Sequence, residues 1–140
     1  MLKRRRLGKT SLNVSEIGLG CWQLGGELNI NGVSTTYGNV TQENAKAIIE
    51  NALDFGVNVF DTEDVYSLGQ SERRLGKVLK EQRNDVYIFT KAVQVPTYTE
   101  TTLGELDFSY NHLISAINRS LKRLDTDYID LFQIHIPPES

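Results

Sequence analysis

Four ionisable side chains of different types each follow a short apolar run, or the turn after one: Asp61, Tyr66, Lys91 and His135. If these runs are parallel strands, the residues that follow them meet at the carboxyl edge of the sheet. Each residue also has an ordinary role available, as a helix cap, loop packing, a solvated strand end or a polar plug. For any one of them alone, the ordinary role is the better interpretation.

Together the four side chains could carry out one kind of reaction. A phenol is a weak acid, with an ordinary pKa of about 10, and a nearby ammonium lowers that pKa by stabilising the phenolate. A carboxylate beside the ammonium keeps it charged and in place, and an imidazole can donate a hydrogen bond to a carbonyl oxygen. Such a set could protonate a carbonyl oxygen while a hydride reaches the carbon. A protein has no hydride of its own, so this chemistry requires a reduced nicotinamide.

Alternating strands and helices are needed to position these groups. Amphipathic segments, with apolar residues every three or four positions, follow the candidate caps Thr41 and Ser71, and a third begins at Asp107 or Ser109. Gly56 is expected to end the first of them. The short apolar runs predict strands at residues 17–22, 57–60, 86–89 and 128–134.

This order predicts a parallel sheet with right-handed helical crossovers, preceded by two short extended pieces within residues 7–12 around a turn at 8–10. A doubly wound sheet and part of a (β/α)8 barrel both fit. A complete barrel needs about 250 residues and eight strands, whereas this chain has 140 residues and four predicted strands. Residues 1–140 contain no internal repeat or linker, so we expect one structural unit.

Composition excludes several classes of protein. The 15 Lys and Arg against 18 Asp and Glu give a net charge of −3, which argues against a broadly basic nucleic-acid binder. No apolar window is long enough for a membrane span, and a single cysteine, Cys21, rules out an internal disulfide. The basic run at residues 3–6 is not followed by an apolar segment, so we expect a solvated edge, no signal peptide and a cytoplasmic location.

Several segments resemble, in order and spacing, those of the aldo-keto reductase family. They are residues 7–15 with 17–20, 56–66 with 69–76, 89–91, and 127–135. The resemblance spans essentially the whole chain. It implies the N-terminal half of a (β/α)8 barrel, in which a hairpin is followed by four parallel strands and three helices. The Gly-Gln-Ser-Glu sequence at residues 69–72 is similar to the bacterial and channel-β-subunit-like branches.

The resemblance also implies roles for the four side chains. Tyr66 would be the general acid, Lys91 would lower its pKa, Asp61 would pair with Lys91, and His135 would orient the substrate carbonyl. The expected cofactor is NADP(H), and the residues expected near it are Gly20, Cys21, Trp22 and Asp61. The residues expected at a small carbonyl substrate are Trp22, Tyr66 and His135. No metal is expected, because His112 and His135 are the only histidines and His112 is predicted to be a surface or capping residue.

We therefore expect an NADP-dependent reductase of aldehydes or ketones, present as a fragment that lacks most of the cofactor site. The alternatives are a non-catalytic, cofactor-sensing regulatory subunit and an inert fragment of the same family. A half-barrel would leave two sheet edges open, so self-association through those edges is also expected.

Overall fold

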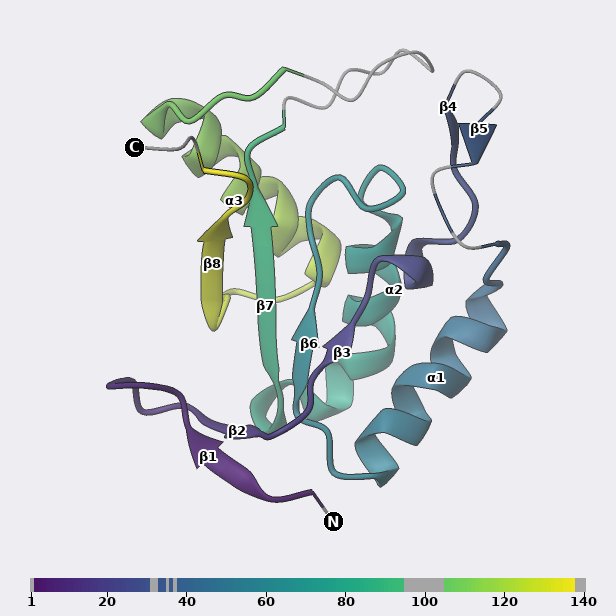
Figure 1. Ribbon diagram of the computed structural model, residues 1–140, viewed down its shortest axis with the longest axis vertical. Helices are drawn as coiled ribbons and strands as arrows, with labels where there is room; N and C mark the ends of the chain where they lie inside the picture. The colour runs from purple at the N-terminus through teal and green to yellow at the C-terminus, as the bar shows by residue number, and fades with distance from the viewer. Residues whose placement is uncertain (1, 31–32, 35, 37, 95–104, 138–140) are drawn as a thin grey trace.

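A four-stranded parallel sheet forms the centre of the molecule (Figure 1). The structure is a computed structural model, and it describes residues 2–30, 33–34, 36, 38–94 and 105–137. The strands lie in the order β3-β6-β7-β8, with bounds Leu19–Gly20, Val59–Asp61, Tyr87–Ala92 and Leu131–Ile134. Three helices lie along one face of this sheet (Figure 1): α1 (Gln42–Asp54), α2 (Gln70–Leu79) and α3 (Tyr110–Leu124).

Shorter elements complete the fold. The strands β1 (Arg4–Arg6) and β2 (Asn13–Ser15) form an antiparallel hairpin below the amino ends of the sheet (Figure 1). A second small hairpin pairs β4 (Asn29–Ile30) with β5 (Val33–Ser34). Two 3-10 helices are η1 (Gln23–Gly25) and η2 (Lys80–Asp85). The prediction of a hairpin, four parallel strands and three helices is confirmed. The β4–β5 pair was not predicted.

Several predicted boundaries differ from the observed ones. The first sheet strand is only Leu19–Gly20, because Ile17 is exposed and Trp22 already has helical backbone angles. The strand β8 begins at Leu131, later than predicted, whereas β7 runs on to Ala92 and so includes Lys91. Residues 7–12 are the turn of the first hairpin, and its strands lie on either side. The basic strand β1 is fully exposed, as expected.

Two of the predicted helix caps are present. The hydroxyl of Thr41 accepts a hydrogen bond from the backbone N–H of Asn44 at 3.2 Å, and Ser109 accepts one from that of His112 at 3.3 Å. The third helix is therefore capped by Ser109. Asp107 lies just before it and accepts a bond from the Ser109 N–H at 2.8 Å. Each cap satisfies a backbone donor that the first turn of a helix leaves unpaired.

The prediction that Ser71 caps the second helix was wrong. Gly69 is the N-cap, with a φ of +81°, and Ser71 lies inside α2. The Ser71 hydroxyl donates to the carbonyl of Cys21 at 2.7 Å and lies 2.9 Å from the Thr62 hydroxyl. It therefore ties the start of α2 to the carboxyl ends of β3 and β6.

The core lies between the sheet and the helices. It is built from apolar residues of the three helices, of β6 and β7, and of segments next to the strands: Cys21, Leu24, Ala45, Ile49, Val57, Phe60, Leu75, Leu79, Val86, Ile88 and Leu124. The helices α2 and α3 approach closely at Gly76, where an added Cβ would lie 2.3 Å from the carbonyl oxygen of Leu124. No helix in the described part of the chain is long and apolar enough to cross a membrane.

Candidate active site

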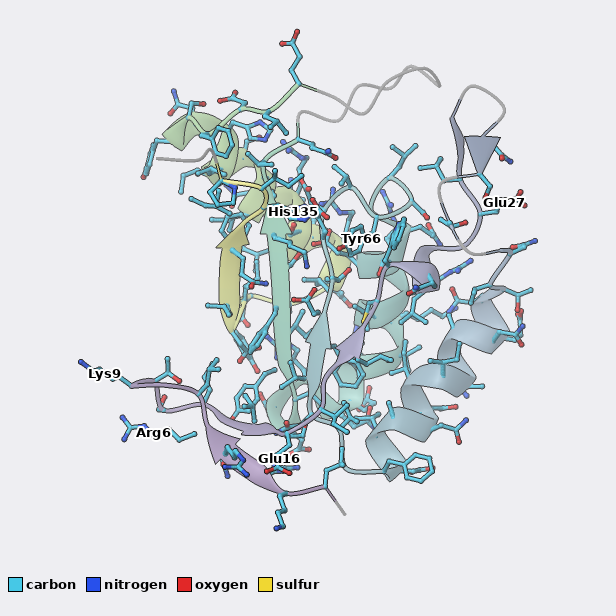
Figure 2. All side chains as sticks on the ribbon, viewed as in Figure 1. Arg6, Lys9, Glu16, Glu27, Tyr66 and His135 are labelled. Atoms are coloured by element: carbon cyan, nitrogen blue, oxygen red, sulfur yellow. The ribbon has the colours of Figure 1, made fainter. Side chains whose placement is uncertain are left out.

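The carboxyl end of the sheet holds all four expected side chains. Asp61 is the last residue of β6, Lys91 is the last but one of β7, and His135 directly follows β8. Tyr66 lies in the loop between β6 and α2. Figure 2 shows Tyr66 and His135 near the same end of the sheet. The expected placement at one rim agrees with these positions, while the role of each residue is still a prediction.

Lys91 connects three of these groups. Its side chain is almost completely buried, and its ammonium forms an ion pair with Asp61 and donates to the carbonyl of Thr62 at 2.9 Å. The second carboxylate oxygen of Asp61 accepts a hydrogen bond from Gln133 at 3.2 Å. The Lys91 Nζ also lies 5.3 Å from the centre of the Tyr66 ring. The Lys91 ammonium is therefore paired with the Asp61 carboxylate and lies near the aromatic ring of Tyr66.

His135 contacts a residue that the sequence analysis missed. Its Nδ1 lies 2.6 Å from Oε1 of Glu63, whose side chain is 1% exposed, while the His135 side chain is 34% exposed. The signal was available in the spacing, because Glu63 comes two residues after Asp61 and alternate residues of an extended segment point the same way. Burial raises the pKa of Glu63, against the opposing effects of His135 and Lys91.

The pKa of the Tyr66 phenol is shifted in the opposite direction to the one expected. Its pKa is raised well above the ordinary value, first by burial and then by the carboxylates of Glu63 and Asp61. The expected lowering by Lys91 does not prevail, because the ammonium is paired with Asp61 and a second carboxylate stands beside the ring. Tyr66 is therefore fully protonated at neutral pH.

A strained turn follows Tyr66 directly. Ser67 and Leu68 both have positive φ, at +48° and +54°, and Gly69 follows at +81°. Consecutive non-glycine residues in this region cost on the order of 1–3 kcal/mol each. The turn is held by the Ser67 hydroxyl, which donates to the carbonyl of Gly26 at 2.9 Å, and by the Leu68 N–H, which donates to the carbonyl of Val65 at 2.9 Å.

The residues expected at the cofactor differ in accessibility. Gly20 is exposed, with open space where a Cβ would be. Trp22 is 37% exposed, and its ring centre lies 6.4 Å from that of Tyr66. Cys21 is completely buried, and burial and the Asp61 charge raise the pKa of its thiol. Its side chain is therefore neither a nucleophile nor a contact for a ligand, and only its backbone can face one.

Two buried carboxylates support the site from behind. Glu72 on α2 is completely buried and accepts bonds from the Thr90 hydroxyl at 2.7 Å and from Arg123 on α3 at 2.5 Å. Asp64 lies 3.8 Å from Arg119, and its pKa is raised to about 7 by burial and by the charge of Glu72. No cluster of three or more His, Cys, Asp or Glu side chains suited to a metal occurs among the described residues. His112 was predicted to be a surface or capping residue; its side chain is 9% exposed, and its backbone N–H is bonded to the cap, which is Ser109.

The sequence profile of the aldo/keto reductase family matches residues 16–140. The chain belongs to the aldo/keto reductase family. It is 37% identical over 140 residues to the aldo-keto reductase YhdN of Bacillus subtilis, an alignment that covers 94% of this chain and 37% of YhdN. It is also 37% identical over 142 residues to a putative voltage-gated potassium channel subunit beta of Schizosaccharomyces pombe, covering 97% of this chain and 37% of that protein.

The fold of this aldo/keto reductase chain is similar to that of a solved relative. The holo form of aldo-keto reductase AKR11C1 from Bacillus halodurans superposes with a TM-score of 0.79 at 34% identity. The match covers 96% of this chain and 40% of that structure. The chain therefore spans about two fifths of the length of the relatives it matches, and its sheet and helices correspond to part of a (β/α)8 barrel.

Proposed function

We propose that this chain carries the proton-donating part of a nicotinamide-dependent carbonyl reductase, which converts an aldehyde or a ketone to an alcohol. The observation that supports the proposal most is the position of the Lys91 ammonium, which is paired with Asp61 and lies 5.3 Å from the Tyr66 ring centre, with His135 at the same edge of the sheet. Membership in a family of oxidoreductases agrees with it. The identity of the carbonyl compound stays open within this class.

In the proposed reaction, His135 orients the carbonyl oxygen and Tyr66 gives its hydroxyl proton to that oxygen. The reduced nicotinamide, expected as NADPH, supplies the hydride for the carbonyl carbon when bound. The raised pKa of Tyr66 keeps its proton in place until charge develops on the substrate. Transfer is still favourable then, because an alkoxide is a stronger base than a phenolate. The ammonium of Lys91 stabilises the phenolate that remains.

The described residues fit only the nicotinamide end of such a cofactor. The open backbone at Gly20, the half-exposed indole of Trp22 and the partly exposed carboxylate of Asp61 form one border of the rim. These residues would hold the nicotinamide ribose, with Cys21 contributing its backbone alone. A preference for NADP over NAD is a prediction from the family resemblance.

A second candidate is a cofactor-sensing subunit that turns over slowly or not at all. Two observations favour it: the 37% identity to a protein named as a channel subunit beta, and the raised pKa of Tyr66, which weakens this residue as a proton donor. An inert fragment is the third candidate. All three candidate functions predict the same site residues, so only measurements of NADPH binding and of turnover separate them.

The test compares Tyr66→Phe with the same change at Tyr110, which is 77% exposed on α3. NADPH oxidation with a simple aldehyde is followed by absorbance, and NADPH binding by fluorescence. Loss of the acid predicts a fall in turnover of about a hundredfold or more for Tyr66→Phe and none for Tyr110→Phe. Equal turnover in both variants, with NADPH bound, would favour sensing. A failure of the unaltered chain to bind NADPH would favour the inert fragment.

The outer strands β3 and β8 support a further proposal, self-association through the sheet edges. Within the described sheet each has one neighbour, and Ile134 on β8 is half exposed. An unpaired strand edge presents backbone donors and acceptors that a second chain can pair with. Sedimentation velocity over a wide concentration range should detect a dimer, and a monomer at every concentration would reject the proposal.

A further inference from the structure

Glu63 is a buried acid in direct contact with a candidate substrate-binding residue. It is 1% exposed, and its Oε1 lies 2.6 Å from Nδ1 of His135, 72 positions along the chain. The imidazole is 34% exposed, so a substrate can reach it while Glu63 is shielded from water. Figure 2 shows His135 at the same end of the sheet as Tyr66.

The number of protons on this pair determines what His135 can do. With a Glu63 carboxylate and a neutral imidazole, the Nδ1–H donates to Glu63 and Nε2 is a bare acceptor, unable to donate to a carbonyl oxygen. One additional proton changes this in either arrangement. A carboxylate with an imidazolium leaves an Nε2–H, and so does a carboxylic acid that donates to Nδ1 of a neutral ring. The donor on Nε2 is therefore present whenever the pair holds that proton.

The surroundings of the pair bear on whether it holds the proton. Burial disfavours a bare carboxylate and raises the pKa of Glu63. The other charged or titratable groups near Glu63 are Lys91 and Tyr66, which oppose this effect through a charge and a hydrogen bond respectively, and Asp64, whose own pKa is raised in part by Glu63. Asp61 is paired with Lys91. An acid in this position favours sharing a proton over carrying an isolated charge.

We propose that Glu63 is a positioning residue that shares a proton with His135 and so keeps an Nε2–H available for the substrate carbonyl oxygen. The inference rests on the proposed carbonyl reduction for its purpose, but the shared proton can be measured without turnover. No proton leaves the pair in the reaction. The pair polarises the carbonyl, and the proton that reaches the oxygen comes from Tyr66.

The test is nitrogen NMR of the chain labelled with 15N-histidine. The chain has two histidines, so loss of one signal in His135→Gln assigns the other to His112. In the unaltered chain we expect the Nε2 of His135 to be protonated at pH 7. A bare Nε2 at that pH would overturn the proposal, whatever happens to the variants.

The variants then test whether Glu63 is responsible. In Glu63→Gln, and in Glu63→Ala should the first not fold, the pH at which Nε2 loses its proton should fall by about one unit or more. Asp64→Asn is the matched control, because it removes a neighbouring buried carboxyl that does not contact His135; its shift should be clearly smaller. Equal midpoints in the unaltered chain and in Glu63→Gln would contradict the proposal.

Turnover separates this inference from the proposed function. If the Tyr66→Phe comparison shows reduction, Glu63→Gln should lower kcat/KM about tenfold at pH values above the midpoint of the unaltered chain, because a shift of about one unit leaves about a tenth as many molecules with the Nε2–H. If Tyr66→Phe has no effect while the NMR midpoints differ as expected, the proton-sharing pair exists and the proposed reduction is what fails.

Discussion

The close approach of α2 and α3 at Gly76 predicts a substitution whose effect opposes helix propensity. In the interior of a helix, Ala is more favourable than Gly by about 1 kcal/mol, so Gly76→Ala should stabilise an isolated α2. In this fold the new Cβ would lie 2.3 Å from the carbonyl oxygen of Leu124 and 2.5 Å from its carbonyl carbon. To restore ordinary contact, the two helices must separate by about 1 Å.

That separation is costly because the obstacle is backbone. Overpacking of a core costs about 1–3 kcal/mol, and a main-chain contact cannot be relieved by a rotamer change, so we take the upper end. Subtracting the propensity gain of about 1 kcal/mol leaves an expected loss of about 2 kcal/mol in the free energy of unfolding. The movement would also pull Arg123 on α3 away from Glu72 on α2.

Urea unfolding followed by circular dichroism measures the effect. Lys77→Ala is the control, because Lys77 is an exposed residue of the same helix and both residue types form helices well. It should change the free energy of unfolding by no more than about 0.5 kcal/mol. A Gly76→Ala chain as stable as the original, or more stable, would refute the packing argument.

Three further predictions concern buried or capping polar groups. Glu72→Gln leaves Arg123 without its charged partner and should cost about 3–5 kcal/mol in urea unfolding; an unchanged midpoint would contradict this. The pKa of Asp64 is about 7 in the folded chain, so the folded state binds the proton more tightly, and stability from this group falls as the pH rises from about 4 to about 7. Asp64→Asn should flatten that slope and add up to about 4 kcal/mol above pH 7, as pH-dependent unfolding would show; parallel curves would count against it. Ser109→Ala removes the cap of α3 and should cost about 1 kcal/mol, and a thermal melt without change would show that the cap contributes little.

Sequence periodicity predicted the larger elements of this fold because their apolar faces are repeated over several turns or strands. The helix after Thr41 and the one after Ser109 are examples, since each combines a capping side chain with a regular apolar face. The cap of α2 could not be predicted in this way. Gly69 takes the cap position through a left-handed backbone conformation and not through a side-chain hydrogen bond. Ser71 is a residue type that often caps helices, but its hydroxyl bonds instead to Cys21 and Thr62, which follow β3 and β6.

The same distinction applies to the site. Asp61, Lys91 and His135 could be placed at one rim because each lies at or directly after the end of a strand, and strand ends converge by topology. The spacing from Asp61 could place Glu63 near the same rim, but it could not identify His135 as its partner, since their contact joins residues 72 positions apart. The direction of the pKa shift of Tyr66 could not be predicted from the charges in the sequence either, because it depends on which carboxylates lie buried beside the ring.

The left-handed turn at Ser67 and Leu68 has a consequence for attempts to evolve or engineer this chain. Glycine in place of Leu68 would relax the backbone without removing the Ser67 hydrogen bond, and it is expected to raise thermal tolerance. The same relaxation would let the side chain of Tyr66, which precedes the turn, change its orientation. Selection for heat resistance alone should therefore favour glycine at position 68 and reduce turnover, whereas selection for turnover should retain Leu68.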